Sequence, residues 1–186
     1  MLFRSAAVLR APSLRALVRS ILEASDKVHR QLEAQDEALA AVSVEIRGEE
    51  AELVEAALAA ARRGDHIWQM LQAVDPNQLR QEVAARRTAA ERALDPDVAR
   101  SLKEAAEAKE REMASWRDLA GLVDRIEADL VAADAALDEL HVRVVRLAAQ
   151  EPGTAGGLEV RQQVKDLAER LHILERSAEA TMLEVG

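Results

Sequence analysis

The stretch from Trp116 to Leu147, WRDLAGLVDRIEADLVAADAALDELHVRVVRL, determines the fold class of this chain. Apolar side chains recur in it at alternating spacings of three and four residues, which places them along one face of an α-helix. Every position of this seam is apolar, and its members are Trp116, Leu119, Val123, Ile126, Leu130, Ala133, Leu137, Leu140, Val144 and Leu147. Such a seam is buried against other helices, so it predicts an all-α protein and a candidate helix–helix interface.

Two Asp-Pro pairs set the helix boundaries around this seam. Asp95-Pro96 combines an acidic N-cap with a proline suited to the first helical position, and the next strong breaker is Pro152. We therefore expect one helix over about 97–150, whose first half has a poor seam at 103–112 and is expected to be a solvated arm. Asp75-Pro76 has the same form and predicts a short helix over about 76–94.

The upstream sequence carries a second seam. From Pro12-Ser13, where Ser13 is a candidate N-cap, eleven of the fourteen seam positions between Leu14 and Ala60 are apolar. The register continues to residue 74, which predicts one long helix over about 13–74. Gly48 and Gly64 are expected to weaken or bend this helix, with Gly64 as a candidate hinge.

The segment EPGTAGG at 151–157 is the one obvious loop, and apolar spacing resumes after it in a final predicted helix over 158–185. A loop this short favours an antiparallel return onto the well-patterned half of the preceding helix. We therefore expect an elongated antiparallel helical bundle, or coiled-coil hairpin, as a single domain over 13–186. The seam of the first helix would pack on this hairpin or on a second copy of the chain.

Composition narrows the classes of function. The 186-residue chain has no Cys, seven Gly, four Pro and 2% aromatic residues. Large rings line much of the surface of enclosed pockets, so we expect no deep catalytic cleft, no enzyme activity and no thiolate metal site. A net charge of −9 argues against binding by phosphate neutralisation, so no nucleic-acid partner is expected.

Residues 1–22 form a basic amphipathic segment. They contain four Arg and no acid, so they carry +4, while the remaining 21 basic and 34 acidic residues give −13. The segment is compatible with an anchor on an anionic membrane surface, with a mitochondrial import signal, or with the packed start of the long helix. The residues that would carry the membrane or targeting role are Leu2, Phe3, Arg4, Arg10, Arg15 and Arg19.

Three of the four histidines follow an acid by three residues, the spacing at which both side chains share one helix face. The pairs are Asp26 with His29, Asp138 with His141, and Glu169 with His172. Glu-x-x-His pairs hold metal in di-iron bundles when they point into the bundle. Here each His lies on the flank of a seam and its acid mostly faces outward, so we expect flanking interface residues, no metal and no cofactor.

No motif of nucleophilic catalysis or phosphate binding occurs, and we expect no catalytic residue. Arg63-Gly64-Asp65 matches an adhesive tripeptide, but its place inside a predicted helix argues against that role.

The expected function is a non-enzymatic coiled-coil scaffold or assembly protein that contacts itself or partner proteins through its helical seams. The alternative is a peripheral membrane-surface protein anchored by residues 1–22. A basic amphipathic start followed by long charged helices resembles the phage-shock membrane-remodelling proteins in architecture, without a shared residue motif, and implies that alternative. With no apolar run of about 18 residues and no secretory signal, we expect a cytoplasmic protein, with the mitochondrial matrix or a membrane surface as the alternative location.

Overall fold

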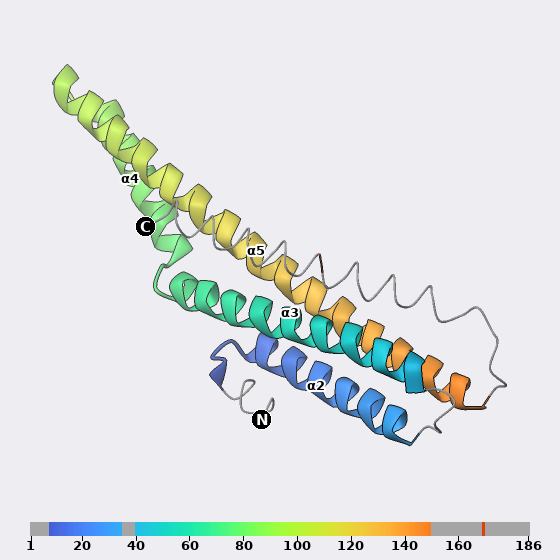
Figure 1. The fold of residues 1–186 in the computed structure, drawn as a ribbon. Helices are drawn as coiled ribbons and strands as arrows, with labels where there is room; N and C mark the ends of the chain where they lie inside the picture. Colours follow the sequence, from blue (N-terminus) through green and yellow to red (C-terminus); the bar gives the residue numbers. More distant parts are fainter. Residues whose placement is uncertain (1–7, 35–39, 150–168, 170–186) are drawn as a thin grey trace.

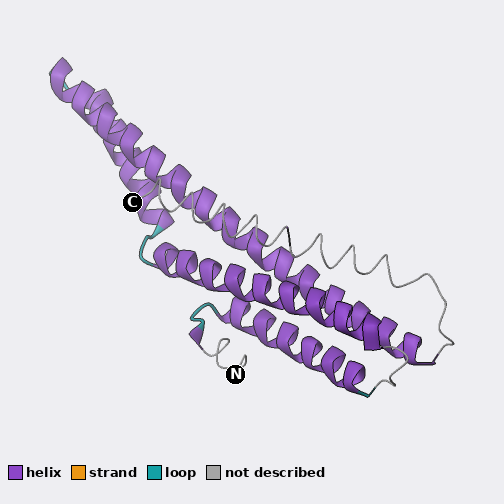
Figure 2. Ribbon diagram, viewed as in Figure 1, coloured by secondary structure: helices purple, strands orange, loops and turns teal. Residues whose placement is uncertain are grey.

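The computed structural model describes residues 8–34, 40–149 and 169. Four α-helices make up this part of the chain, and they contact one another (Figure 1 and Figure 2). They are α2 (Pro12–Glu33), α3 (Ala40–Gln72), α4 (Pro76–Arg92) and α5 (Pro96–Ala149). The prediction of an all-α bundle is confirmed.

The predicted helix starts at the two Asp-Pro pairs are also confirmed. Asp75 accepts a hydrogen bond from the backbone N–H of Asn77 at 2.8 Å, and Asp95 accepts one from Asp97 N–H at 2.8 Å. Each carboxylate satisfies a backbone donor in a first turn that has no intrahelical acceptor, and each proline lies where no donor is needed. The predicted loop at 151–157 and helix at 158–185 lie outside the described residues, and so does the predicted return of that helix onto α5.

The prediction of one long helix over 13–74 is wrong. α2 ends at Glu33, and α3 packs against it as a separate helix. Ala11 near the start of α2 contacts Asp65 near the end of α3, and Ser25 further along α2 contacts Glu50 earlier in α3. The two helices are therefore antiparallel, as Figure 1 shows. Because the chain folds back, the apolar seams of α2 and α3 are buried within it. A single continuous helix would leave these seams exposed to water.

α2, α3 and the second half of α5 form a three-helix core. Hydrogen bonds from Ser13 to Glu127 and from Ser20 to Asp134 join residues at the same sequence offset, so α2 and α5 run parallel while α3 runs against both (Figure 1). The buried apolar side chains of this core include Leu14, Val18, Ile21, Val28, Ile46, Leu53, Ala57, Ala60, Ile67, Leu119, Ile126, Leu130, Leu137 and Val144. Burial of these side chains supplies most of the favourable free energy of the fold.

α4 and the first half of α5 form a two-helix arm that extends beyond the three-helix core (Figure 1). Ion pairs of Arg87 with Glu110 and of Lys109 with Glu82 show that the two helices are antiparallel. Residues 103–112 belong to this arm, as the sequence predicts, but α4 covers one side of them. The arm buries few apolar side chains, chiefly Leu79, Val83 and Ala106.

None of the described helices combines the length and the apolar character needed to cross a membrane.

Candidate functional site

The seam of α5 lies inside the three-helix core. Val123 and Leu140 are at most 6% exposed, and Ile126, Leu130 and Leu137 are fully buried. Leu119 and Val144 are buried as well, whereas Trp116 is half-buried where the arm meets the core. The side chain of Leu147 is outside the described part of the chain. The candidate interface residues from 119 to 144 therefore contact α2 and α3 of the same chain.

The basic amphipathic segment contributes its apolar face to the same core. Leu14, Val18 and Ile21 are at most 1% exposed. Leu2, Phe3 and Arg4 lie outside the described residues. Among the remaining candidates for membrane or targeting contact, Arg10 and Arg19 are exposed, and Arg15 is partly buried.

Arg15 holds the chain that precedes α2. Its guanidinium Nε donates a hydrogen bond to the carbonyl oxygen of Leu9 at 2.8 Å, and a second guanidinium nitrogen donates to the same oxygen. A charged donor that binds one carbonyl twice fixes the backbone of residues 9–11 against the helix. Leu9 is 4% exposed and Ala11 is fully buried.

Asp65 of α3 caps α2 from another helix. Its Oδ1 accepts hydrogen bonds from the backbone N–H groups of Arg10 at 2.7 Å and Ala11 at 2.6 Å, and its Oδ2 accepts one from Gln69 at 2.7 Å. Ala11 is the N-cap residue and has no side chain that could do this. The expected cap, Ser13, instead donates to Glu127 of α5.

The predicted hinge at Gly64 is wrong, because α3 continues through it and Gly64 is a close-packing point between three helices. A Cβ atom built there would lie 3.1 Å from Leu14 Cδ1 and 3.3 Å from Ile126 Cγ2. The absent side chain lets α2 and α5 approach α3 closely. The tripeptide 63–65 thus contributes a glycine contact and a helix cap to the core.

A buried polar cluster joins α2 and α3 at the other end of the core. Glu50 is 1% exposed; its Oε1 accepts a short hydrogen bond from the Ser25 hydroxyl, and its Oε2 lies 3.0 Å from His29 Nδ1. Burial raises the pKa of Glu50, while the Ser25 hydrogen bond and the charge of His29 act in the opposite direction. The carboxylate lies between the hydroxyl and the imidazole, so the histidine does not contact the serine as it does in a nucleophilic triad. The cluster therefore places an ionisable carboxyl group between α2 and α3.

The acids of two of the three His-containing pairs form ion pairs with basic side chains, and His172 of the third pair lies outside the described residues. Asp26 pairs with Arg30 at 3.4 Å, and Asp138 pairs with Lys27 of α2 at 3.4 Å. The part of the chain that the structure describes has no group of three or more acidic or histidine side chains placed to hold a metal ion.

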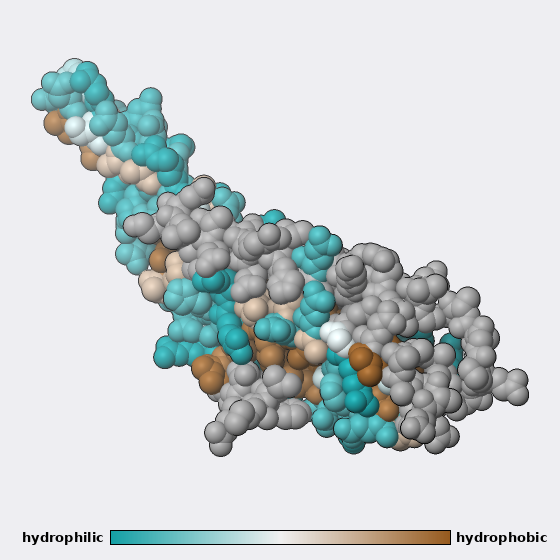
Figure 3. Space-filling view, viewed as in Figure 1, coloured by the Kyte–Doolittle hydropathy of each residue, from teal (hydrophilic) through white to brown (hydrophobic). Residues whose placement is uncertain are grey.

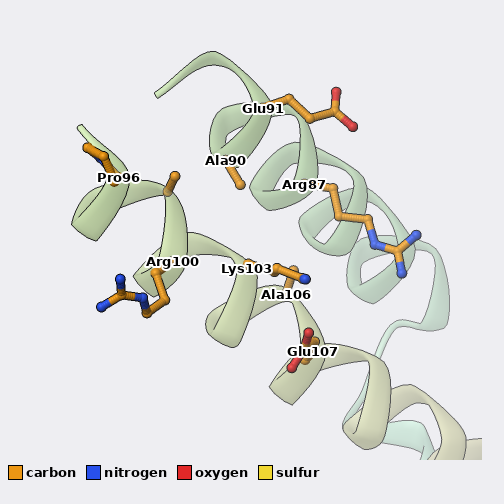
Figure 4. Close-up of a pocket in the computed structure, with 9 residues that line it drawn as sticks. Arg87, Ala90, Glu91, Pro96, Arg100, Lys103, Ala106 and Glu107 are labelled. Atoms are coloured by element: carbon orange, nitrogen blue, oxygen red, sulfur yellow. The ribbon is translucent and has the colours of Figure 1, made fainter. Parts of the chain in front are cut away.

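An open groove of about 600 Å³ lies on the arm between α4 and α5 (Figure 4). Small and charged residues line it, and they are Arg87, Ala90, Glu91, Pro96, Ala99, Arg100, Lys103, Ala106 and Glu107. Figure 3 shows the surrounding surface of the arm as mainly hydrophilic, with a narrow band of less polar residues along it. The lining consists of three alanines, Pro96 and five charged side chains.

Sequence patterns missed Asp65, Glu50 and the groove. Asp65 and Glu50 act on residues 54 and 25 positions away, and no local spacing marks such contacts. One signal was present: Ala11 before Pro12 opens a helix without a capping side chain, so another part of the chain has to satisfy the free N–H groups.

Comparisons with protein families, with curated proteins and with solved structures gave no match to this chain.

Proposed function

We propose that this protein is a non-enzymatic helical scaffold that acts through helix–helix contacts with itself or with partner proteins. The observation that carries this proposal is a stripe of three exposed valines on one face of α5. Val131 is 54%, Val142 47% and Val145 40% exposed. Their spacings of eleven and three residues put them on one face of the helix, turned away from the buried seam.

A narrow apolar stripe on a long rigid helix suits a particular kind of partner. Single exposed apolar residues are common on protein surfaces, but a stripe at helical spacing is complementary to the apolar face of another helix. Asp138 lies on the same face between Val131 and Val142, with Glu139 next to it. Both side chains are charged and exposed, so they can determine which partner binds and in which register.

Sedimentation of the full chain combined with a pull-down tests this function directly. We expect a self-associated species or a captured helical partner at micromolar concentration. Joint replacement of Val131 and Val142 by Asp should weaken an association that uses the stripe, while Val44→Asp on exposed α3 surface serves as the control. A strict monomer that captures no partner would contradict the proposal.

A peripheral membrane role for residues 1–22 is the second proposal. Arg10 and Arg19 are exposed, and Val8, two residues before Arg10, is 77% exposed. These groups could contact anionic headgroups while Leu14 and Val18 remain in the core. Vesicles with increasing anionic lipid should bind the full chain more strongly at low salt, and Arg10→Glu with Arg19→Glu should abolish binding. No binding to anionic vesicles at low salt would end this proposal.

A further inference from the structure

The groove on the arm is bordered by charges in a regular order. On α4, Arg87 and Glu91 are one helical turn apart, and on α5, Lys103 and Glu107 have the same spacing. The α4 wall carries one cation and one acid, and the α5 wall carries Arg100 in addition to the pair of Lys103 and Glu107 (Figure 4).

The two walls are offset so that unlike charges share a level. Ion pairs of Lys109 with Glu82 and of Arg87 with Glu110 fix the antiparallel register of the walls. In this register Arg87 lies near the level of Glu107, and Glu91 lies near the level of Lys103. Within the described residues, neither Lys103 nor Glu107 has an ion pair or hydrogen bond, so both can bind a partner.

This order of charges is complementary to itself. A two-fold axis across the middle of the groove reverses the direction of a second arm and places Lys103 opposite Glu107 of the second copy. The same axis places Arg87 opposite Glu91 of the second copy, so each of these four charges gains an opposite neighbour.

We infer that the arm is a dimerisation site in which the α4–α5 hairpins of two copies pack antiparallel as a four-helix bundle. This inference rests on the proposed scaffold function and names a second copy of this chain as the partner. The alanines of the groove, Ala90, Ala99 and Ala106, permit close approach of the facing helices.

The apolar residues at the end of the arm fit the same arrangement. Leu94 is fully exposed, and Val98 is 50% exposed. Reversal about the middle of the arm brings this end of one copy to the base of the other arm, at the level of its half-buried Trp116. Dimerisation thus covers exposed leucine and valine side chains that the arm alone leaves in water.

Charge reversal in the full chain tests this interface. In the Lys103→Glu variant, residue 103 of each copy becomes an acid that faces Glu107 of the other copy. In the Glu107→Lys variant, residue 107 of each copy becomes a cation that faces Lys103 of the other copy. Each change acts twice in a symmetric dimer, so each variant should dimerise about tenfold more weakly, or worse, in sedimentation equilibrium. An equimolar mixture of the two variants restores every opposite pair and should form a mixed dimer.

Glu104→Lys is the matched control, because Glu104 is an exposed acid on the same helix outside the groove and undergoes the same charge change. It should dimerise like the unchanged chain, and circular dichroism should show equal helix content in all variants. If the unchanged chain associates and the reversed variants associate as strongly as Glu104→Lys, the arm interface is wrong and the scaffold proposal stands. If the unchanged chain is a monomer at high micromolar concentration, the arm interface is wrong; capture of another protein would then be needed to keep the scaffold proposal.

Discussion

Asp65 in α3 accepts a hydrogen bond at 2.6 Å from the backbone N–H of Ala11, the residue that caps α2. The carboxylate is 5% exposed, and its other oxygen is held by Gln69 at 2.7 Å. One buried side chain therefore satisfies the start of one helix from within another. This contact fixes where α2 begins and in which register it packs on α3.

Replacement of Asp65 by Ala should lower the free energy of unfolding by about 1–3 kcal/mol, because two buried backbone N–H groups lose their acceptor. Asp65→Asn should cost less, since the amide oxygen can still accept. Chemical denaturation monitored by circular dichroism measures both changes. Glu55→Ala, an exposed acid on α3, should stay within about 0.5 kcal/mol of the unchanged chain. An equal effect at Asp65 and Glu55 would show that the cap contributes nothing.

Gly64 and Gly48 offer a matched pair in α3. A Cβ atom at Gly48 has no atom within 4 Å, so Gly48→Ala should stabilise the protein by about 0.5–1 kcal/mol through helix propensity alone. A Cβ atom at Gly64 crowds Leu14 and Ile126, so Gly64→Ala should gain less, and Gly64→Val should cost about 1–3 kcal/mol. Thermal unfolding of the three variants checks the order. Similar stabilisation by both alanine variants would contradict the close packing at Gly64.

Glu50→Gln should change the pH dependence of stability. The pKa of Glu50 is raised in the folded protein, so its favourable contribution is complete below the unfolded value of 4.5 and is lost as the pH rises through the folded value. The amide of the variant does not titrate and can still accept the Ser25 hydrogen bond. The variant should therefore gain stability relative to the unchanged chain between mildly acidic and neutral pH. Denaturation curves at several pH values test this, and a difference that does not vary with pH would contradict it.

α4 should open more readily than the three-helix core. The arm buries Leu79, Val83 and Ala106, whereas α3 buries a continuous face that includes Leu53, Ala57 and Ala60. Local opening is governed by such differences in buried apolar contact. Backbone amides of 79–90 should exchange hydrogen faster than those of 53–61 at low protein concentration, measured by mass spectrometry. Equal protection in both segments would be inconsistent with a thinly packed arm.

The sequence predicted those parts of the fold that local chemistry determines. Asp75-Pro76 and Asp95-Pro96 carry a complete helix start within two residues, and α4 and α5 begin at these prolines. The seam from Leu119 to Val144 repeats every turn, and its burial follows from that spacing.

The reversal between α2 and α3 could not be predicted in the same way. Residues 34–39 contain neither Gly nor Pro, and the seam spacing runs through them unchanged. The sequence of α3 does carry an indication of the reversal. Leu53 and Ala56 lie on one stripe of this helix and Val54 and Ala57 on the neighbouring stripe, and all four are buried. Two adjacent stripes on one helix indicate two packing partners, which a single rod cannot supply. The pairing of Asp65 with Ala11 then depends on this reversal.

A distance between α2 and α3 tests most directly whether the two helices are antiparallel. The Asp65 cap, the Glu50 cluster and the three-helix core all depend on this arrangement. The chain has no Cys, so Arg19→Cys and Glu55→Cys allow one spin label on each helix at exposed positions. In the antiparallel pair the labels should lie within about 30 Å, given helix axes about 10 Å apart. A single continuous helix would hold them about 54 Å apart at 1.5 Å per residue. A pulsed electron resonance distance below about 30 Å is the predicted result, and one near 54 Å would contradict the fold described here.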